Sequence, residues 1–87
     1  MARLIMFYGT ECEHCEKMVP LVKKLEKEES VKVERIETWH NSTNKKKFEE
    51  MDKGECGGVP LFVNTNTGKK ICGETSFEKL KTWALGK

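Results

Sequence analysis

The chain has 87 residues, enough for one domain with a real core but not for two. Hydrophobic residues make up 37% and charged residues 34%, which indicates a small core under a densely charged surface. The 16 basic and 14 acidic residues are interspersed, so we expect no nucleic-acid partner. No apolar stretch approaches the roughly 18 residues of a membrane-spanning helix, so we expect no membrane partner either. These properties predict a single domain over residues 1–87.

The start of the chain carries no recognisable targeting signal. The apolar opening, Met1–Tyr8, is too short for a signal peptide and leads directly into a cysteine motif. We therefore expect an intracellular protein in the cytoplasm.

The first half of the chain predicts a strand, a helix and a second strand. The run Leu4–Tyr8 is short, continuous and apolar, which is typical of a strand buried on both faces. Apolar residues between Met18 and Leu25 then recur with helical spacing, and Pro20 predicts a bend in that helix. Val31–Ile36 alternates with period two, so the two strands and the helix should form a parallel βαβ unit.

The second half predicts a helix, a hairpin and a last helix. Asn41–Lys53 begins with capping residues and carries a narrow apolar stripe. Leu61–Val63 and Lys70–Cys72 flank a turn-rich stretch, which indicates an antiparallel hairpin. Thr75–Glu78 matches a capping box at the start of the last helix. The predicted order is β-α-β-α-β-β-α, an α/β fold with a four-stranded mixed sheet flanked by three helices.

The motif Cys12-Glu13-His14-Cys15 carries the chemistry. Its cysteines lie at a strand-to-helix junction, where the helix N-terminus favours a thiolate at Cys12. Cys12 should therefore be the nucleophile, and Cys15, one turn deeper, the resolving thiol. His14 can stabilise the Cys12 thiolate, whereas Glu13 opposes it, so both are candidate modulating residues. The motif predicts a thiol-disulfide oxidoreductase that needs no cofactor.

A metal site is the main alternative to redox chemistry. A Cys-X-X-Cys pair is also half of a zinc site, but the chain has no second such pair, so we expect no metal. The alternative that we keep is a metal or iron-sulfur binding module using Cys12, Cys15 and, as a third ligand, Cys56.

The sequence allows several interpretations of the other two cysteines, Cys56 and Cys72. Cys56 lies four residues before Pro60 and could form mixed disulfides, regulate by oxidation, bind metal or have no function. Cys72 is expected to be a small packed residue. A bridge between the two is conceivable but unusual in a reducing cytosol. Trp39 and His40 are assigned no catalytic role.

Two segments resemble the thioredoxin superfamily. Phe7–Pro20 resembles its active-site strand, motif and first helix, and Gly57–Val63 resembles its cis-proline segment. The resemblance implies a thioredoxin fold, a redox-active disulfide between Cys12 and Cys15, and substrate binding at Val59 and Pro60. It also implies a cis peptide bond before Pro60, whereas X-Pro bonds in folded proteins are cis only about 5 to 6% of the time. Protein disulfides would be the substrates, and an upstream thiol reductant or reductase would supply electrons.

At several positions the chain differs from the residues that are typical of thioredoxins and of glutaredoxins, and these differences bear on which of the two subfamilies it resembles more. The chain has the length of a glutaredoxin, and it has Glu11 and Met6 where thioredoxins usually place a tryptophan and a buried acid. It has Thr10 where glutaredoxins usually place a basic residue, and Gly73-Glu74 at their glutathione-binding turn. We favour a glutaredoxin-sized protein with thioredoxin-like activity in electron transport and cell redox homeostasis. A glutathione-dependent glutaredoxin, with glutathione as a partner, is the further alternative.

Overall fold

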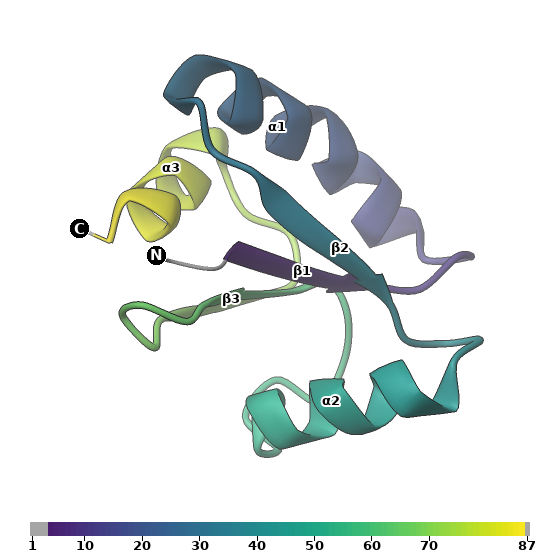
Figure 1. Cartoon of the computed structure of the whole chain (residues 1–87). Helices are drawn as coiled ribbons and strands as arrows, with labels where there is room; N and C mark the ends of the chain where they lie inside the picture. The colour runs from purple at the N-terminus through teal and green to yellow at the C-terminus, as the bar shows by residue number, and fades with distance from the viewer. Residues whose placement is uncertain (1–3, 87) are drawn as a thin grey trace.

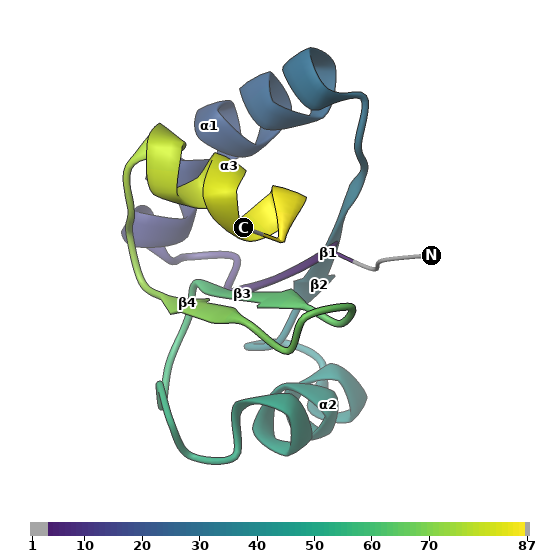
Figure 2. The same cartoon turned by 90° about the vertical axis from the view of Figure 1, so that its left-hand side faces the viewer.

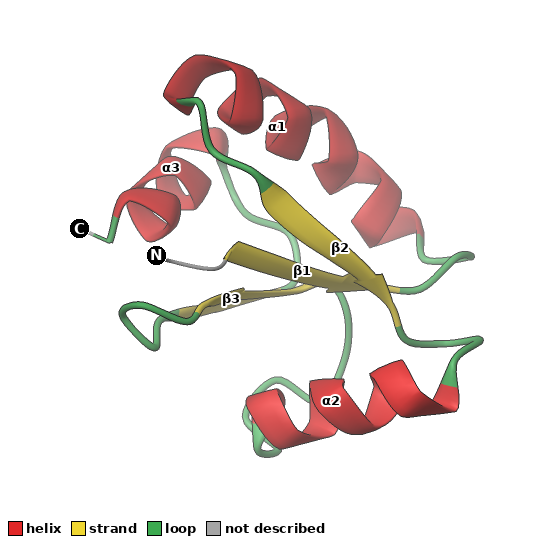
Figure 3. Cartoon of the chain, in the orientation of Figure 1, coloured by secondary structure: helices red, strands yellow, loops and turns green. Residues whose placement is uncertain are grey.

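The computed structural model describes residues 4–86 and has the predicted order of elements (Figures 1 and 3). Residues 1–3 and 87 of the predicted domain lie outside the described residues. The elements are β1 (Leu4–Tyr8), α1 (Glu13–Glu29), β2 (Val33–Glu37), α2 (Ser42–Asp52), β3 (Leu61–Asn64), β4 (Lys70–Cys72) and α3 (Phe77–Leu85). The prediction of an α/β fold with a four-stranded mixed sheet and three helices is confirmed.

The strand order in the sheet is β2-β1-β3-β4. β1 pairs with β2 in parallel, with Phe7 opposite Ile36, and with β3 in antiparallel orientation, with Phe7 opposite Leu61. β3 and β4 form the expected antiparallel hairpin, which places β4 at the edge of the sheet (Figure 2). Within residues 4–86, no helix is long and apolar enough to cross a membrane.

The sheet separates two hydrophobic clusters. Helices α1 and α3 cover one face and α2 covers the other (Figures 1 and 2). Leu4 and Met6 of β1 belong to the cluster under α1 and α3, whereas Ile5 and Phe7 belong to the cluster over α2. Because successive side chains of a strand point to opposite faces, a continuous apolar run is the sequence of a strand covered on both sides. The predicted burial of β1 on both faces is confirmed.

Helices α1 and α2 begin where the sequence indicates. The side chain of Asn41 accepts a hydrogen bond from the backbone N–H of Asn44 at 3.0 Å, which confirms the predicted cap of α2. Pro20 lies inside α1 without ending that helix.

The predicted start of α3 is wrong by one residue. Ser76, rather than Thr75, is the N-cap, and its Oγ accepts from the backbone N–H of Lys79 at 3.3 Å. Ser76 has extended backbone angles and Phe77 opens the helix, so the third helical position falls on Lys79 and not on Glu78. The capping box predicted at Thr75–Glu78 is therefore replaced by a cap from Ser76 alone.

Candidate active site

Two segments that are far apart in the sequence meet at one end of the sheet. β1 ends at Tyr8, β3 begins at Leu61, and the two strands are antiparallel neighbours. The residues that follow β1 and those that precede β3 therefore leave the sheet at the same end. As a result, Sγ of Cys12 lies 3.9 Å from the carbonyl oxygen of Val59.

Cys12 is the N-cap of α1. Its backbone is extended, and its Sγ accepts a hydrogen bond from the backbone N–H of Cys15 at 3.2 Å. A helix N-terminus presents unpaired N–H groups and partial positive charge, both of which favour a thiolate. Cys12 and Cys15 are free thiols with exposed fractions of 5% and 2%. The structure thus places both predicted cysteines together, with Cys12 as the acceptor of the N–H bond.

The second cysteine is held in its protonated form. Burial, followed by the hydrogen bond and the charge of Cys12, raises the pKa of Cys15 from 9.0 to about 12. Near neutral pH Cys15 is therefore a thiol. Because only a thiolate attacks a disulfide, the raised pKa disfavours Cys15 as the first nucleophile.

The segment Val59–Pro60 contains a cis peptide bond. The expectation of a trans bond from general frequencies is wrong here, and the cis bond is the one that the superfamily resemblance implies. Pro60 is buried, and its carbonyl oxygen accepts from the N–H of Gly73 at 2.8 Å. Val59 is half-buried and packs against both hydrophobic clusters, so its carbonyl is held beside Cys12.

The two middle residues of the motif are exposed. Nδ1 of His14 pairs with the carboxylate of Glu74, in the loop before α3. This hydrogen bond lowers the pKa of Glu74, and the charge of Lys17 acts in the same direction. His14 therefore links the start of α1 to the loop after β4. The sequence did not indicate Glu74 as its partner, because the two residues are 60 positions apart.

Glu37, at the end of β2, organises the loops around the motif. Its carboxylate accepts from N–H and Oγ of Thr10, at 2.9 and 3.1 Å, and from the N–H groups of Trp39 and His40, at 3.2 and 2.7 Å. Burial acts to raise the pKa of Glu37, but the bonds from His40 and Thr10 outweigh it and lower that pKa. Glu37 was missed by the sequence analysis. A glutamate at a strand end carries no local signal for donors 27 residues away.

Trp39 and His40 lie against the segment that leads to Cys12. The indole ring of Trp39 covers Gly9 so closely that a Cβ at Gly9 would come 2.1 Å from the ring. His40 pairs with the carboxylate of Glu11, and this hydrogen bond and charge raise the pKa of His40. Both residues, for which the sequence predicts no catalytic role, therefore help to shape the surroundings of the motif.

A groove of about 640 Å³ adjoins Cys12 through Val59. Trp39, Phe48 and Val59 give it apolar walls. Two lysines, Lys45 and Lys53, and two acidic residues, Glu49 and Asp52, add charges of both signs. The volume lies within the range of ligand-binding pockets, and the mixture of apolar walls and a few polar groups is typical of them. Trp39 is 53% exposed, so its ring is available to a bound ligand.

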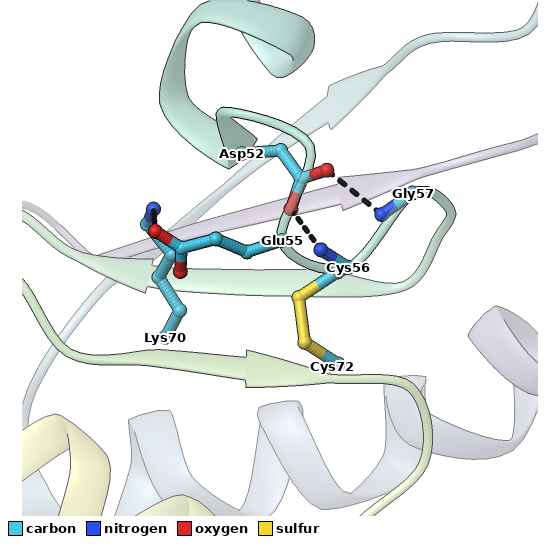
Figure 4. Close-up of a disulfide and its surroundings, with 6 residues drawn as sticks. All are labelled: Asp52, Glu55, Cys56, Gly57, Lys70 and Cys72. Atoms are coloured by element: carbon cyan, nitrogen blue, oxygen red, sulfur yellow. Dashed lines mark hydrogen bonds and ion pairs between the residues drawn. A yellow bond between two sulfur atoms is a disulfide. The ribbon is translucent and has the colours of Figure 1, made fainter.

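Cys56 and Cys72 form a disulfide with a Cα–Cα distance of 5.5 Å (Figure 4). The predictions of Cys56 as a free loop thiol or as a third metal ligand are therefore wrong, because its sulfur is bonded to Cys72. The prediction of Cys72 as a packed residue is also wrong, since it lies exposed on β4. The carboxylate of Asp52 accepts from the N–H groups of Cys56 and Gly57, at 2.7 and 2.8 Å, and so shapes the loop that carries Cys56.

In the described part of the chain, no group of three or more His, Cys, Asp or Glu side chains is arranged to hold a metal ion.

Comparisons with known proteins do not identify the chain. No protein-family model matches it, and no curated protein matches it significantly.

Proposed function

We propose that the chain is a thiol-disulfide oxidoreductase with a thioredoxin fold, and that it exchanges disulfides in protein substrates through Cys12 and Cys15. One observation carries the proposal. Sγ of Cys12 lies at a helix N-terminus, 3.2 Å from the N–H of Cys15 and 3.9 Å from the carbonyl of Val59. This arrangement places a thiol, whose ionised form the helix N-terminus favours, beside a backbone segment that can hold a substrate.

The first step is attack by Cys12. Its thiolate attacks one sulfur of the substrate disulfide, a mixed disulfide forms, and the other substrate sulfur leaves as a thiolate that takes a proton. The helix N-terminus and the N–H of Cys15 stabilise the attacking thiolate. Cys15, with its pKa raised to about 12, stays protonated and does not compete.

The second step is resolution by Cys15. Formation of the mixed disulfide removes the negative charge of Cys12 and its role as hydrogen-bond partner, both of which raise the pKa of Cys15. The Cys15 proton is then lost more readily, and the resulting thiolate attacks Sγ of Cys12. The second substrate sulfur leaves and is protonated. The substrate has gained two electrons and two protons, and the protein holds a Cys12–Cys15 disulfide that an upstream thiol reductant or reductase must reduce.

The surroundings of Val59 favour a polypeptide substrate. The carbonyl oxygen of Val59 contacts Cys12, and Val59 also lines the groove with Trp39 and Phe48. An extended peptide that pairs with the Val59 backbone would place side chains in this groove. The resemblance to the superfamily implies the same role for Val59 and Pro60.

Two variants test the reaction. Cys12→Ser is expected to abolish reduction of a protein disulfide such as insulin, because the nucleophile is lost. Cys15→Ser is expected to accumulate a mixed disulfide with the substrate through Cys12, because the resolving thiol is lost. Mass spectrometry of the trapped adduct after proteolysis identifies the sulfur that carries the substrate.

A matched control removes the other two cysteines. Cys56→Ser and Cys72→Ser, added to Cys15→Ser, should leave the adduct at Cys12 in place. Wild-type protein that does not reduce the substrate when dithiothreitol supplies electrons would contradict the proposal. Stoichiometric zinc or iron in freshly purified protein, lost in Cys12→Ser, would contradict it as well.

A further inference from the structure

The Cys56–Cys72 disulfide ties the loop before Pro60 to the edge strand of the sheet. Cys56 lies in the loop between α2 and β3, and Cys72 lies in β4, opposite Leu61 of β3. The loop continues from Cys56 to Val59, whose carbonyl contacts Cys12. The disulfide is therefore a covalent restraint three residues from the proposed substrate-binding residue.

The other restraints on the loop are noncovalent. Val59 packs against both hydrophobic clusters, Cys56 packs against the cluster over α2, and the N–H of Glu55 donates to the carbonyl of Asp52 at 3.0 Å. The buried carboxylate of Asp52 binds the N–H groups of Cys56 and Gly57, and an ion pair of 3.3 Å joins Glu55 to Lys70 of β4 (Figure 4). Both interactions hold residues that precede Gly58 in the sequence, and neither involves Gly58 or Val59. Three glycines, at positions 54, 57 and 58, give the loop unusual backbone freedom. Without the disulfide, we expect this glycine-rich loop to sample many more conformations.

The disulfide is accessible to small thiols. Cys72 is exposed and belongs to β4, the last strand in the sheet order, whereas Cys56 is half-buried. Exposed disulfides are the ones that reductants open readily, in contrast to buried structural ones. Because Cys72 is the more exposed of the two residues, we expect a small thiol to attack its sulfur.

We propose that Cys56–Cys72 is a second redox site, opened by a small monothiol such as glutathione, and that its opening releases the loop that holds Val59 beside Cys12. One thiolate attacks Sγ of Cys72, and Cys56 leaves as a thiolate that takes a proton. A second thiolate attacks the mixed disulfide and releases the Cys72 thiolate, which is protonated. Two monothiols thus become one disulfide, and the protein gains two electrons and two protons.

The consequence for activity depends on the proposed function. With the second disulfide closed, the loop presents Val59 to the substrate in a fixed position. With it open, binding a substrate must first order the loop, so affinity falls while the chemistry at Cys12 and Cys15 is unchanged. The protein would therefore bind its substrates best when this second site is oxidised.

The first experiment does not depend on activity. Cys12→Ser/Cys15→Ser keeps only the second pair, and the protein is equilibrated in glutathione buffers from oxidising to reducing. Alkylation and mass spectrometry should show reversible opening of Cys56–Cys72, and amide hydrogen exchange at residues 54–59 should speed up about tenfold or more on opening. A disulfide that glutathione leaves closed in the folded protein, or exchange that does not change on opening, would overturn the proposal.

The second experiment measures the effect on substrate. Cys56→Ser/Cys72→Ser is compared with wild type in which alkylation shows the second disulfide closed, using a peptide disulfide. We expect KM to rise about tenfold and kcat to stay within about twofold. An unchanged KM would refute the link between the second site and binding. If neither protein exchanges disulfides, the proposed function fails, while hydrogen exchange in Cys12→Ser/Cys15→Ser still decides the opening of the loop.

Discussion

At the scale of single residues, position along α1 separates the two thiols of the motif. Cys12 caps the helix and accepts an N–H bond, whereas Cys15 lies in the first turn and is buried by the packing of α1 on the sheet. The same residue type therefore accepts an N–H bond at the helix start at one position and is a thiol with a raised pKa at the other.

The raised pKa of Cys15 predicts a pH dependence of stability. The folded protein holds this proton up to about pH 12, whereas the unfolded chain loses it near pH 9.0. The stabilising contribution of Cys15 is therefore complete below the lower value and is lost as the pH rises between the two. In urea unfolding of the reduced proteins, the stability of wild type should fall more steeply above pH 9.0 than that of Cys15→Ala. Parallel curves would contradict the assignment.

The lowered pKa of Glu37 predicts that the stability of the folded protein decreases as the pH falls, which is the opposite of the dependence on Cys15. Its pKa in the folded protein lies below the ordinary value of 4.5, so its contribution is present above that value and is lost as the pH falls through the lowered pKa. Glu37→Gln should be less stable than wild type near neutral pH. The two carboxylate oxygens share the four hydrogen bonds, whereas glutamine has one neutral acceptor oxygen and an NH2 group that cannot accept.

The difference in stability between Glu37→Gln and wild type should shrink at acidic pH, where wild-type Glu37 is itself protonated. Chemical unfolding at several pH values measures this difference in stability. The control is Glu50→Gln, a substitution of an exposed glutamate on α2. A Glu37→Gln difference that stays constant with pH would show that the charge of Glu37 has no role in holding the loops.

At the scale of elements, the start of α3 shows how a helix cap decides between adjacent candidates. Thr75 and Ser76 both have side chains that cap helices, but only Oγ of Ser76 accepts an N–H bond, from Lys79. Ser76→Ala should lower the free energy of unfolding by about 1 kcal/mol, whereas Thr75→Ala should change it by less than about 0.5 kcal/mol. Thermal or urea unfolding of the two variants provides the measurement. Equal losses would favour the capping box that the sequence suggests.

At the scale of the whole molecule, the sheet produces both the core and the site. Its two faces are covered by different helices, so β1 and β3 are buried on both sides and their ends are fixed relative to each other (Figure 2). Phe62, fully buried on one side of β3, packs edge-on against Trp83 of α3 with ring centroids 5.6 Å apart. The loops at the end of this rigid framework carry Cys12, Val59 and Cys56. Precise placement of loop residues therefore follows from strand pairing.

The sequence by itself determined the order of the elements and the location of the motif. Apolar runs, helical periodicity and turn residues are local patterns, because each depends on neighbours within a few positions. The strand Leu4–Tyr8 and the Asn41 cap of α2 were predicted for this reason. The same locality explains the placement of Cys12 at the start of α1.

Only the tertiary structure decided which distant residues meet. The Cys56–Cys72 disulfide, the two hydrogen bonds from Thr10 to Glu37 and the contact of Cys12 with Val59 all depend on the pairing of strands and the course of loops. Residues 16 to 47 positions apart carry no mutual signal in a single sequence. Their proximity arises when burial of the sheet on both faces fixes the register of β1 against β2 and β3.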